Sequence, residues 1–223
     1  MTGNMRLFVE GVLLVLAALL PIVNPFGGAP MFLAMTADVT KEVRAQLAQR
    51  IAINAFILIL ASLFIGTYVL EFFGLSVPIV QVAGGIVVCA TSWDLLRAES
   101  ATKVAIASEP DDDIGVRAFY PLTLPLTVGP GTISIAITIG AHHPQSVRSL
   151  LVSGTADAVG AALVAALVFL CYRYADRLLR LLGETGTSVL IRFSAFIMLC
   201  IGVQIFWTGA AALLAKVPGE ALR

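Results

Sequence analysis

Two short segments of this sequence combine proline and glycine inside stretches that are otherwise apolar: Asn24-Pro-Phe-Gly-Gly28 and Gly129-Pro-Gly-Thr132. Proline removes a backbone donor and clashes with the preceding turn, while glycine adopts dihedral angles that other residues avoid. Each segment is therefore expected to divide a helix in two. The amide groups that begin each second half, at residues 27–29 and 131–133, would carry the positive end of the helix dipole. Such amides favour a small ligand with a carboxylate.

Two polar side chains fall deep inside other apolar runs. Asp157 lies about ten residues into its run, where an acid is costly unless it faces a cavity or is protonated, so it is a candidate for carrying a coupling proton. The alternative is a hydrogen bond to a neighbour, because small residues at every fourth position from Gly154 to Ala166 predict close helix packing. Asn54 lies at a comparable depth and could bind either a substrate or a backbone carbonyl.

Two further sites have alternatives that the residues leave open. The Thr132 hydroxyl beside the second proline–glycine segment is expected either to cap the helix that follows or to touch a ligand. Asp94 lies one helical turn from Arg97, which predicts an ion pair at the membrane surface.

Several classes of function are excluded by what the sequence lacks. It has no HExxH helix and no GxSxG turn, and its apolar runs hold no His or Lys, so we expect no enzyme activity. Adjacent His142 and His143 and the acidic run Glu109-Pro-Asp-Asp-Asp113 lack the spacing of a metal site. Fourteen basic and fourteen acidic residues cancel, so nucleic acid is not an expected partner. No cofactor is expected beyond a coupling ion, H⁺ or Na⁺.

The composition places these segments in a membrane protein. The chain has 223 residues, of which 59% are hydrophobic and 13% charged, and its mean hydropathy is +0.96. Runs long enough to cross a core of about 30 Å begin near Leu7, Ile51, Val77, Arg117, Leu150 and Val189. We therefore predict an all-α fold with six transmembrane helices. The first and fourth are expected to break about 20 Å along their length, near the bilayer midplane.

The basic residues predict the orientation of these spans. If both termini lie on one side, ten of the fourteen Lys and Arg residues fall on the other side. The positive-inside rule then places both termini outside the cytoplasm. Residues 97–116 form the longest polar connection, and we interpret them as a cytoplasmic linker inside a single membrane domain, residues 1–223.

The two halves of the chain look alike. Leu20-Pro before the first break matches Leu124-Pro before the second, and Phe72-Phe-Gly74 matches Leu181-Leu-Gly183. Each half, at about 7–96 and 117–215, has three spans, so the second half must cross the membrane in the opposite sense. This pattern predicts an inverted repeat, in which the two broken helices meet at a shared site.

Five motifs together resemble the MarC family, also called the neutral amino acid transporter family, over nearly the whole chain. They are Asn24-Pro-Phe-Gly27, Phe73-Gly-Leu-Ser76, Ala83-Gly-Gly85, Pro125 and Gly129-Pro-Gly131. The resemblance implies a six-helix inner-membrane protein that transports small neutral amino acids such as glycine or alanine, coupled to protons or sodium. Members often have Arg where this chain has Gln81 and Gly where it has Ala195, so charge and packing differ here.

The residues and the resemblance together give the expected site and function. The expected substrate-binding residues are Asn24, Pro25, Gly27, Gly28, Asn54, Gly129, Pro130, Gly131 and Thr132, with Asp157 as the coupling residue. The expected function is secondary transport of a small neutral amino acid by alternating access. The alternative is a passive channel or exporter for small neutral solutes. The lipid bilayer is the other expected partner, and the sequence indicates no oligomeric state.

Overall fold

The computed structural model describes residues 2–97, 114–142 and 147–215, and every regular element in these ranges is a helix. Most of the predicted linker, with its acidic run, and His143 lie outside them. The elements are α1 (Thr2–Val23), α2 (Pro25–Met35), α3 (Lys41–Phe72), α4 (Val77–Arg97), α5 (Ile114–Arg117), η2 (Ala118–Thr127), α6 (Pro130–Ala141), α7 (Val147–Arg173) and α8 (Ala175–Leu214).

The chain is an all-helical membrane protein, as predicted. Five helices in the described ranges are long and apolar enough to cross a membrane, with α1 and α2 counted together as Asn4–Met35. A sixth span is obtained if residues 114–127 and 130–141 count as one bent span. Apolar residues also cover much of the surface, as is required of helices that face lipid.

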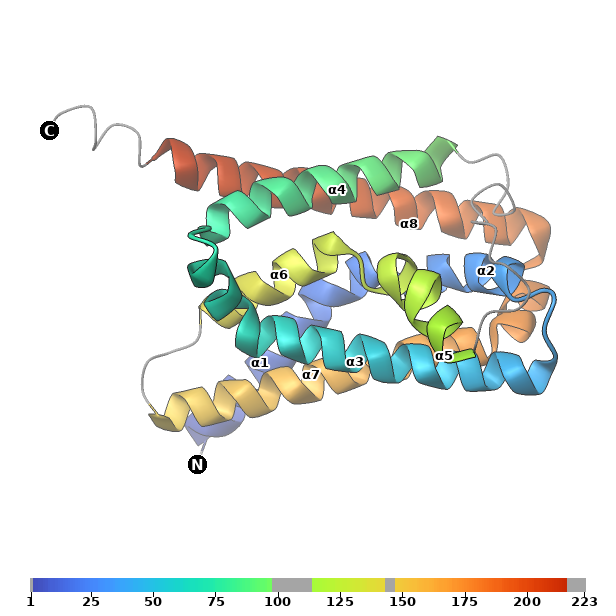
Figure 1. Cartoon of the computed structure of the whole chain (residues 1–223), viewed down its shortest axis with the longest axis horizontal. Helices are drawn as coiled ribbons and strands as arrows, with labels where there is room; N and C mark the ends of the chain where they lie inside the picture. The colour runs from blue at the N-terminus through green and yellow to red at the C-terminus, as the bar shows by residue number, and fades with distance from the viewer. Residues whose placement is uncertain (1, 98–113, 143–146, 216–223) are drawn as a thin grey trace, which may run out of the picture.

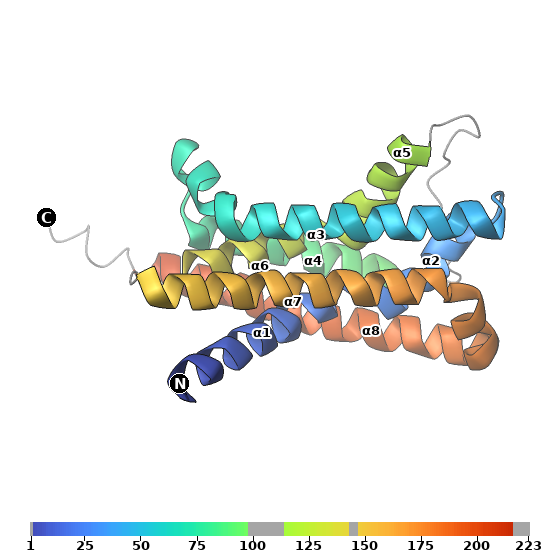
Figure 2. The same ribbon diagram turned by 90° about the horizontal axis from the view of Figure 1, so that it is seen from below.

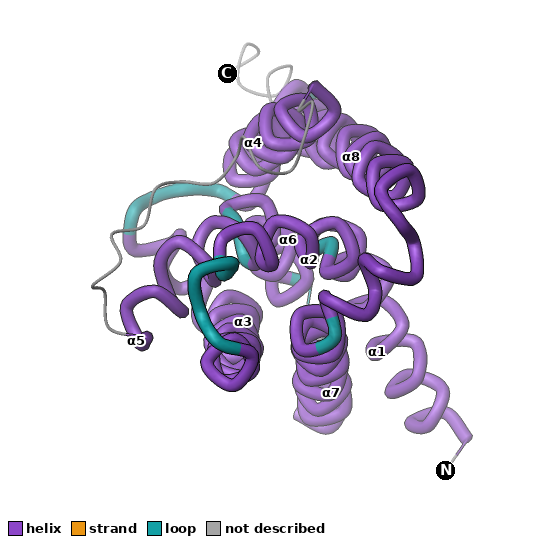
Figure 3. The backbone as a smooth tube through the Cα atoms, turned by 90° about the vertical axis from the view of Figure 1, so that its right-hand side faces the viewer, coloured by secondary structure: helices purple, strands orange, loops and turns teal. Residues whose placement is uncertain are grey.

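The helices form three layers (Figure 3). Helices α4 and α8 lie side by side in one outer layer (Figure 1), and α3 and α7 lie side by side in the other (Figure 2). Between them lie α2, η2 and α6, which are the segments next to the two breaks. Helix α1 packs against α7 along part of its length and leads into this middle layer. The fold therefore brings the two proline–glycine segments together at the centre of the molecule.

Two glycines that the sequence comparison of the halves had matched adopt the same conformation. Gly74 precedes α4 with φ 67°, and Gly183 lies at a bend inside α8 with φ 65°. A residue with a Cβ is strained at positive φ, which explains why glycine occupies both positions. Beyond Gly183, the long membrane-spanning part of α8 is Thr185–Leu214.

Helices α4 and α8 touch through their backbones along a glycine seam, formed by Gly85, Gly202 and Gly209. A methyl group on Gly85 would lie 2.6 Å from the backbone nitrogen of Phe206 and 2.8 Å from the oxygen of Gly202. One on Gly209 would lie 2.6 Å from the oxygen of Pro78. Small residues at a membrane helix interface allow this close approach, and the pair gains dispersion contacts that larger side chains would prevent.

The two ends of the molecule differ in what they hold. The start of α1, the end of α3 and the end of α8 lie at one end, on the left in Figures 1 and 2. The α2–α3 connection and the α7–α8 connection lie at the other end. This second end holds Lys41, Arg44, Arg173 and Arg177, which belong to the basic side predicted from the sequence. The assignment of the basic end to the cytoplasm stays a prediction.

Candidate functional site

The first break is a single residue in a left-handed conformation. Asn24 has φ 44° and ψ 60°, a region that Asn tolerates better than most residues. Its backbone N–H donates to Leu20 O at 2.9 Å, and its backbone oxygen accepts from Gly28 N at 2.9 Å. Its side-chain Oδ1 accepts from Gly27 N at 3.1 Å. The expectation that the amides of Gly27 and Gly28 point at a ligand is therefore wrong, because Asn24 itself binds both.

The second break is longer and sharper than predicted. Tyr120 (φ −123°, ψ 126°) and Leu124 (φ −107°, ψ 125°) already leave helical geometry inside η2. Each precedes a proline, which disfavours the helical conformation of the residue before it. Gly129 is extended, and the chain turns by 71° before α6 begins at Pro130. The irregular backbone thus starts well before the predicted segment, residues 129–132.

The start of α6 keeps its amide groups available. Gly129 is the N-cap residue and makes no side-chain capping bond, and the missing N–H of Pro130 suits the first position of a helix. The N–H groups of Gly131 and Thr132 lie in the first turn, where an α-helix has no internal acceptor for them. Ile133 N–H donates to Gly129 O at 3.2 Å. Of the three amides predicted at the second break, those of Gly131 and Thr132 therefore remain candidates for a ligand.

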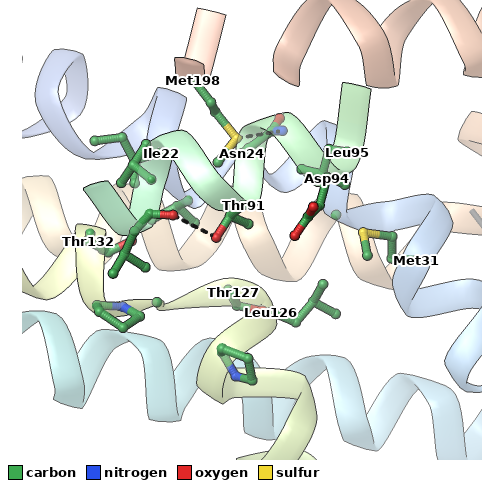
Figure 4. Close-up of a pocket in the computed structure, with 18 of the residues that line it drawn as sticks. Ile22, Asn24, Met31, Thr91, Asp94, Leu95, Leu126, Thr127, Thr132 and Met198 are labelled. Carbon is green, nitrogen blue, oxygen red and sulfur yellow. Dashed lines mark hydrogen bonds between the residues drawn. The ribbon is translucent and has the colours of Figure 1, made fainter. Parts of the chain in front are cut away.

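One cavity of about 380 Å³ joins the two breaks (Figure 4). Six of the predicted site residues line it, namely Asn24, Gly28, Gly129, Pro130, Gly131 and Thr132. The cavity reaches toward the basic end, because Met31 and Met35 of α2 and Asp94 and Leu95 of α4 also line it. Among the described residues, none of α1 before Ile22 and none of α6 after Thr132 lines the cavity. The cavity therefore extends to one end of the molecule only.

Four predicted residues lie outside the cavity lining. Pro25 and Gly27 are buried inside the first break. Asn54 Nδ2 donates to Thr123 Oγ1 at 3.4 Å, so it supports η2 from α3. Asp157 is only 3% exposed on α7 and does not line the cavity. Its coupling role stays a prediction.

Sequence reasoning missed the contribution of α4. Thr91 and Asp94 line the cavity, and Asp94 makes no ion pair with Arg97, whose guanidinium lies 5.8 Å from the ring centre of Trp93 instead. The lining residues of α4 run from Val87 to Leu95 at three- and four-residue spacing, which puts them on one helix face. That spacing was visible in the sequence, but nothing there indicates that this face meets the breaks.

Tyr172 of α7 links the two breaks from behind the cavity. It is fully buried, and its ring stacks on Phe32 of α2 with centroids 4.6 Å apart. Its hydroxyl lies 3.0 Å from Thr127 Oγ1. Because the single hydroxyl hydrogen of Thr127 is directed to Leu122 O at 2.8 Å, Tyr172 is the donor. A methyl group on Gly28 would lie 2.6 Å from the same hydroxyl, so Tyr172 contacts both broken segments.

Two arginines hold the end of α2 beside the cavity. Arg117 donates to both carboxylate oxygens of Asp38 at 2.8 Å and to Met35 O. Arg44 donates to Thr36 O at 2.7 Å and, at 3.1 Å, to Asp176. Positive groups at a helix C-terminus satisfy its last carbonyls and oppose its negative dipole end. The Arg117 hydrogen bonds also lower the pKa of Asp38 below its ordinary value of 3.8.

Comparisons with known proteins agree with the fold. Residues 9–214 match the family model described as MarC family integral membrane protein. A membrane protein of Archaeoglobus fulgidus is 32% identical over 200 residues, which cover 88% of this chain and 90% of that protein. The inner membrane protein MarC of Salmonella arizonae is 27% identical over 207 residues, covering 89% and 93%. No solved structure matches the chain. With a family-model match over residues 9–214 and a relative that is 32% identical over 88% of this chain, the chain belongs to the MarC family of integral membrane proteins.

Proposed function

We propose that this chain is a secondary transporter that moves a small neutral amino acid, of the size of glycine or alanine, across the inner membrane by alternating access. The observation that carries the proposal is one cavity that both broken segments line and that reaches only one end of the molecule. Its volume of about 380 Å³ lies at the lower end of the range for small-molecule sites, about 300–1,000 Å³. A solute of a few heavy atoms fits such a space together with water.

The chemistry of the cavity suits a polar solute without a large net charge. The amides of Gly131 and Thr132 at the start of α6 offer donors and a positive dipole end to a carboxylate. The hydroxyls of Thr91 and Thr132 and the amide of Asn24 add neutral hydrogen-bonding groups. Irregular backbone at membrane depth is tolerated where it lines a polar cavity, which gives the broken segments a functional reason.

The proposal includes an inverted repeat. Supporting it, α3 packs against α7 and α4 packs against α8, so each pair joins equivalent spans of the two halves. Pro25 and Pro130 both occupy the start of the helix after a break. Both termini would then lie outside the cytoplasm, and the cavity would face the cytoplasm in this conformation. The MarC relative from Salmonella arizonae is named an inner membrane protein, which supports the membrane assignment.

Coupling to H⁺ or Na⁺ is part of the same proposal, with Asp157 as the predicted coupling residue. Asp157 is buried inside a membrane-spanning helix. This supports a functional role, because an ionisable side chain inside a membrane is energetically unfavourable. The open alternative is structural, because α7 packs closely on α1. A methyl group on Gly160 would lie 2.7 Å from Val15 Cβ.

The test is counterflow in proteoliposomes that contain the purified full-length chain. Vesicles loaded with unlabelled glycine or alanine should take up the radiolabelled amino acid transiently and with saturable kinetics. Absence of saturable uptake for every small amino acid would contradict the proposal. Flux that rises linearly with concentration and shows no counterflow would favour the passive channel or exporter instead. Vesicles with a Gly131→Leu variant, whose side chain would collide with Val88 at the cavity wall, provide the comparison.

A further inference from the structure

Asp94 is the one side chain with a formal charge among the described residues that line the cavity. The other polar groups there are neutral: the amide of Asn24 and the hydroxyls of Thr91, Thr127 and Thr132. Figure 4 shows the Asp94 carboxylate directed from α4 into the space between Thr91 and Met31. The charge character of the cavity therefore depends on this residue.

The basic residues near Asp94 are engaged elsewhere. Arg97, one turn along α4, lies over the Trp93 ring. At the same end of the molecule, Arg117 is paired with Asp38 and Arg44 with Asp176. Within the described ranges, no ion pair includes Asp94. Asp94 is solvent-exposed and lines the cavity, so its negative charge acts through solvent on whatever enters.

The rise along α4 from the residue beside Gly131 to Asp94 is comparable with the span of a small bound zwitterion. Val88 of α4 lies against Gly131, since a methyl group there would lie 2.0 Å from Val88 Cγ2. Asp94 is six residues further along, or about 9 Å at 1.5 Å per residue. The nitrogen and far carboxylate oxygen of glycine are about 3.5 Å apart, and with a hydrogen bond of about 2.8 Å at each end the ligand spans about 9 Å.

We infer that the Asp94 carboxylate binds the positively charged amine of the solute, so that the cavity selects ammonium-bearing solutes over anions. The carboxylate of a zwitterion then faces the amides of Gly131 and Thr132. The inference rests on the proposed function for the identity of the solute as an amino acid. The preference for a positive charge is a property of the cavity and can be measured without knowing the solute.

A cysteine at position 91 reports the charge preference directly. Thr91 lines the cavity one helical turn from Asp94, so a Thr91→Cys variant places a thiol within about 6 Å of the carboxylate. The reconstituted full-length variant is treated with a cationic trimethylammonium methanethiosulfonate and with an anionic sulfonate methanethiosulfonate. Fragment-ion mass spectrometry assigns modification to position 91 and separates it from Cys89, which lies in the same peptide, while Cys171 and Cys200 lie in other peptides. The readout is the ratio of the two rates.

Adding Asp94→Asn is expected to lower the cation-to-anion rate ratio by about tenfold at low ionic strength. This magnitude follows from Coulomb's law with the dielectric constant of water, for a carboxylate about 6 Å from the reagent charge. Adding Asp94→Glu keeps the ratio high, which separates loss of charge from disturbed folding. Glu71→Gln removes an equal charge at the opposite end of the molecule and leaves the ratio unchanged. An unchanged ratio in the Asp94→Asn variant overturns the inference.

A second measurement tests binding with small probes. Ethylammonium should slow modification of the position 91 thiol when Asp94 is present and fail to do so in the Asp94→Asn variant, whereas propionate should have no effect in either. Equal protection by ethylammonium and propionate, or none by ethylammonium, overturns the inference. If the parent chain shows no saturable glycine uptake but ethylammonium still protects the position 91 thiol, the proposed transport is refuted and the role of Asp94 stands. Saturable uptake with no amine preference refutes the role of Asp94 alone.

Discussion

Replacing Gly28 with alanine tests whether Tyr172 holds the two breaks together. The added methyl group would lie 2.6 Å from the Tyr172 hydroxyl, while the next nearest atoms, ring carbons of the same residue, are 3.5 Å away. The hydroxyl is thus the atom that obstructs the methyl group. Overpacking a buried site costs about 1–3 kcal/mol, so Gly28→Ala should reduce the free energy of unfolding by about this amount, less any gain from the helix preference of alanine.

Tyr172→Phe removes the obstruction. The single change should cost about 0.5–1.5 kcal/mol for the lost hydrogen bond to Thr127, whose own hydroxyl still donates to Leu122 O. In this background the alanine methyl meets the ring at 3.5 Å, an ordinary contact. The double variant should therefore be more stable than the sum of the single changes by about 1–3 kcal/mol. The helix preference of alanine enters both backgrounds and cancels from this coupling energy.

The assay is unfolding of the four full-length proteins in mild detergent titrated with sodium dodecyl sulfate, followed by tryptophan fluorescence. Tyr174→Phe is the matched control, because Tyr174 lies on the surface at the α7–α8 connection, and it should show no coupling with Gly28→Ala. If Gly28→Ala has the same effect on the unfolding free energy in both Tyr172 backgrounds, the contact is not the one described and the reasoning fails.

Four further predictions concern other parts of the molecule. Gly85→Ala pushes a methyl group against the α8 backbone, so it should lower the unfolding free energy by about 3 kcal/mol, measured by the same titration. Asp38→Asn should destabilise the chain at neutral pH. Because Arg117 lowers the pKa of Asp38, this difference should shrink as the pH falls below the ordinary carboxyl pKa and vanish only below the lower folded-state pKa; melting temperatures across pH test this. Asp157→Asn should keep counterflow and lose accumulation driven by a pH gradient. Gly131→Leu should abolish uptake while membrane insertion, measured by fractionation, is unchanged.

Each of these predictions has an outcome that contradicts it. A stable Gly85→Ala variant would show that α4 and α8 are not in backbone contact. A stability difference between Asp38→Asn and the parent chain that persists at low pH would assign it to something other than the ion pair. Accumulation that survives Asp157→Asn would leave only the structural interpretation of that residue. Normal uptake by Gly131→Leu would remove the second break from the transport path.

The sequence predicted the positions of the breaks better than their chemistry. Proline and glycine act locally, so the interruptions at Asn24 and Gly129 could be located without knowing any tertiary contact. The use of the Gly27 amide by the Asn24 side chain is also local, and the preference of Asn for helix N-caps was available as a signal. The early start of the second irregular segment followed from residues 120 and 124 preceding prolines.

The parts that could not be predicted depend on which way a helix face points. Counting residues gives the position of Asn54 along its helix, but this position does not fix rotation about the helix axis, and the side chain supports η2 instead of lining the cavity. The same limit concealed Asp94 and Tyr172, whose importance comes from neighbours far away in the chain. Apolar runs in a membrane protein give little directional signal, because the faces toward lipid and toward protein have similar composition.

The glycine seam has a consequence for how the cavity can change shape. Gly85 and Gly209 contact the backbone of the opposing helix. Helices α4 and α8 are therefore expected to move together as a rigid body. Asp94 lies on α4 and Met198 on α8, and both line the cavity. A displacement of this helix pair that narrows the cavity would therefore also move the carboxylate of Asp94, so access and electrostatic attraction would change together.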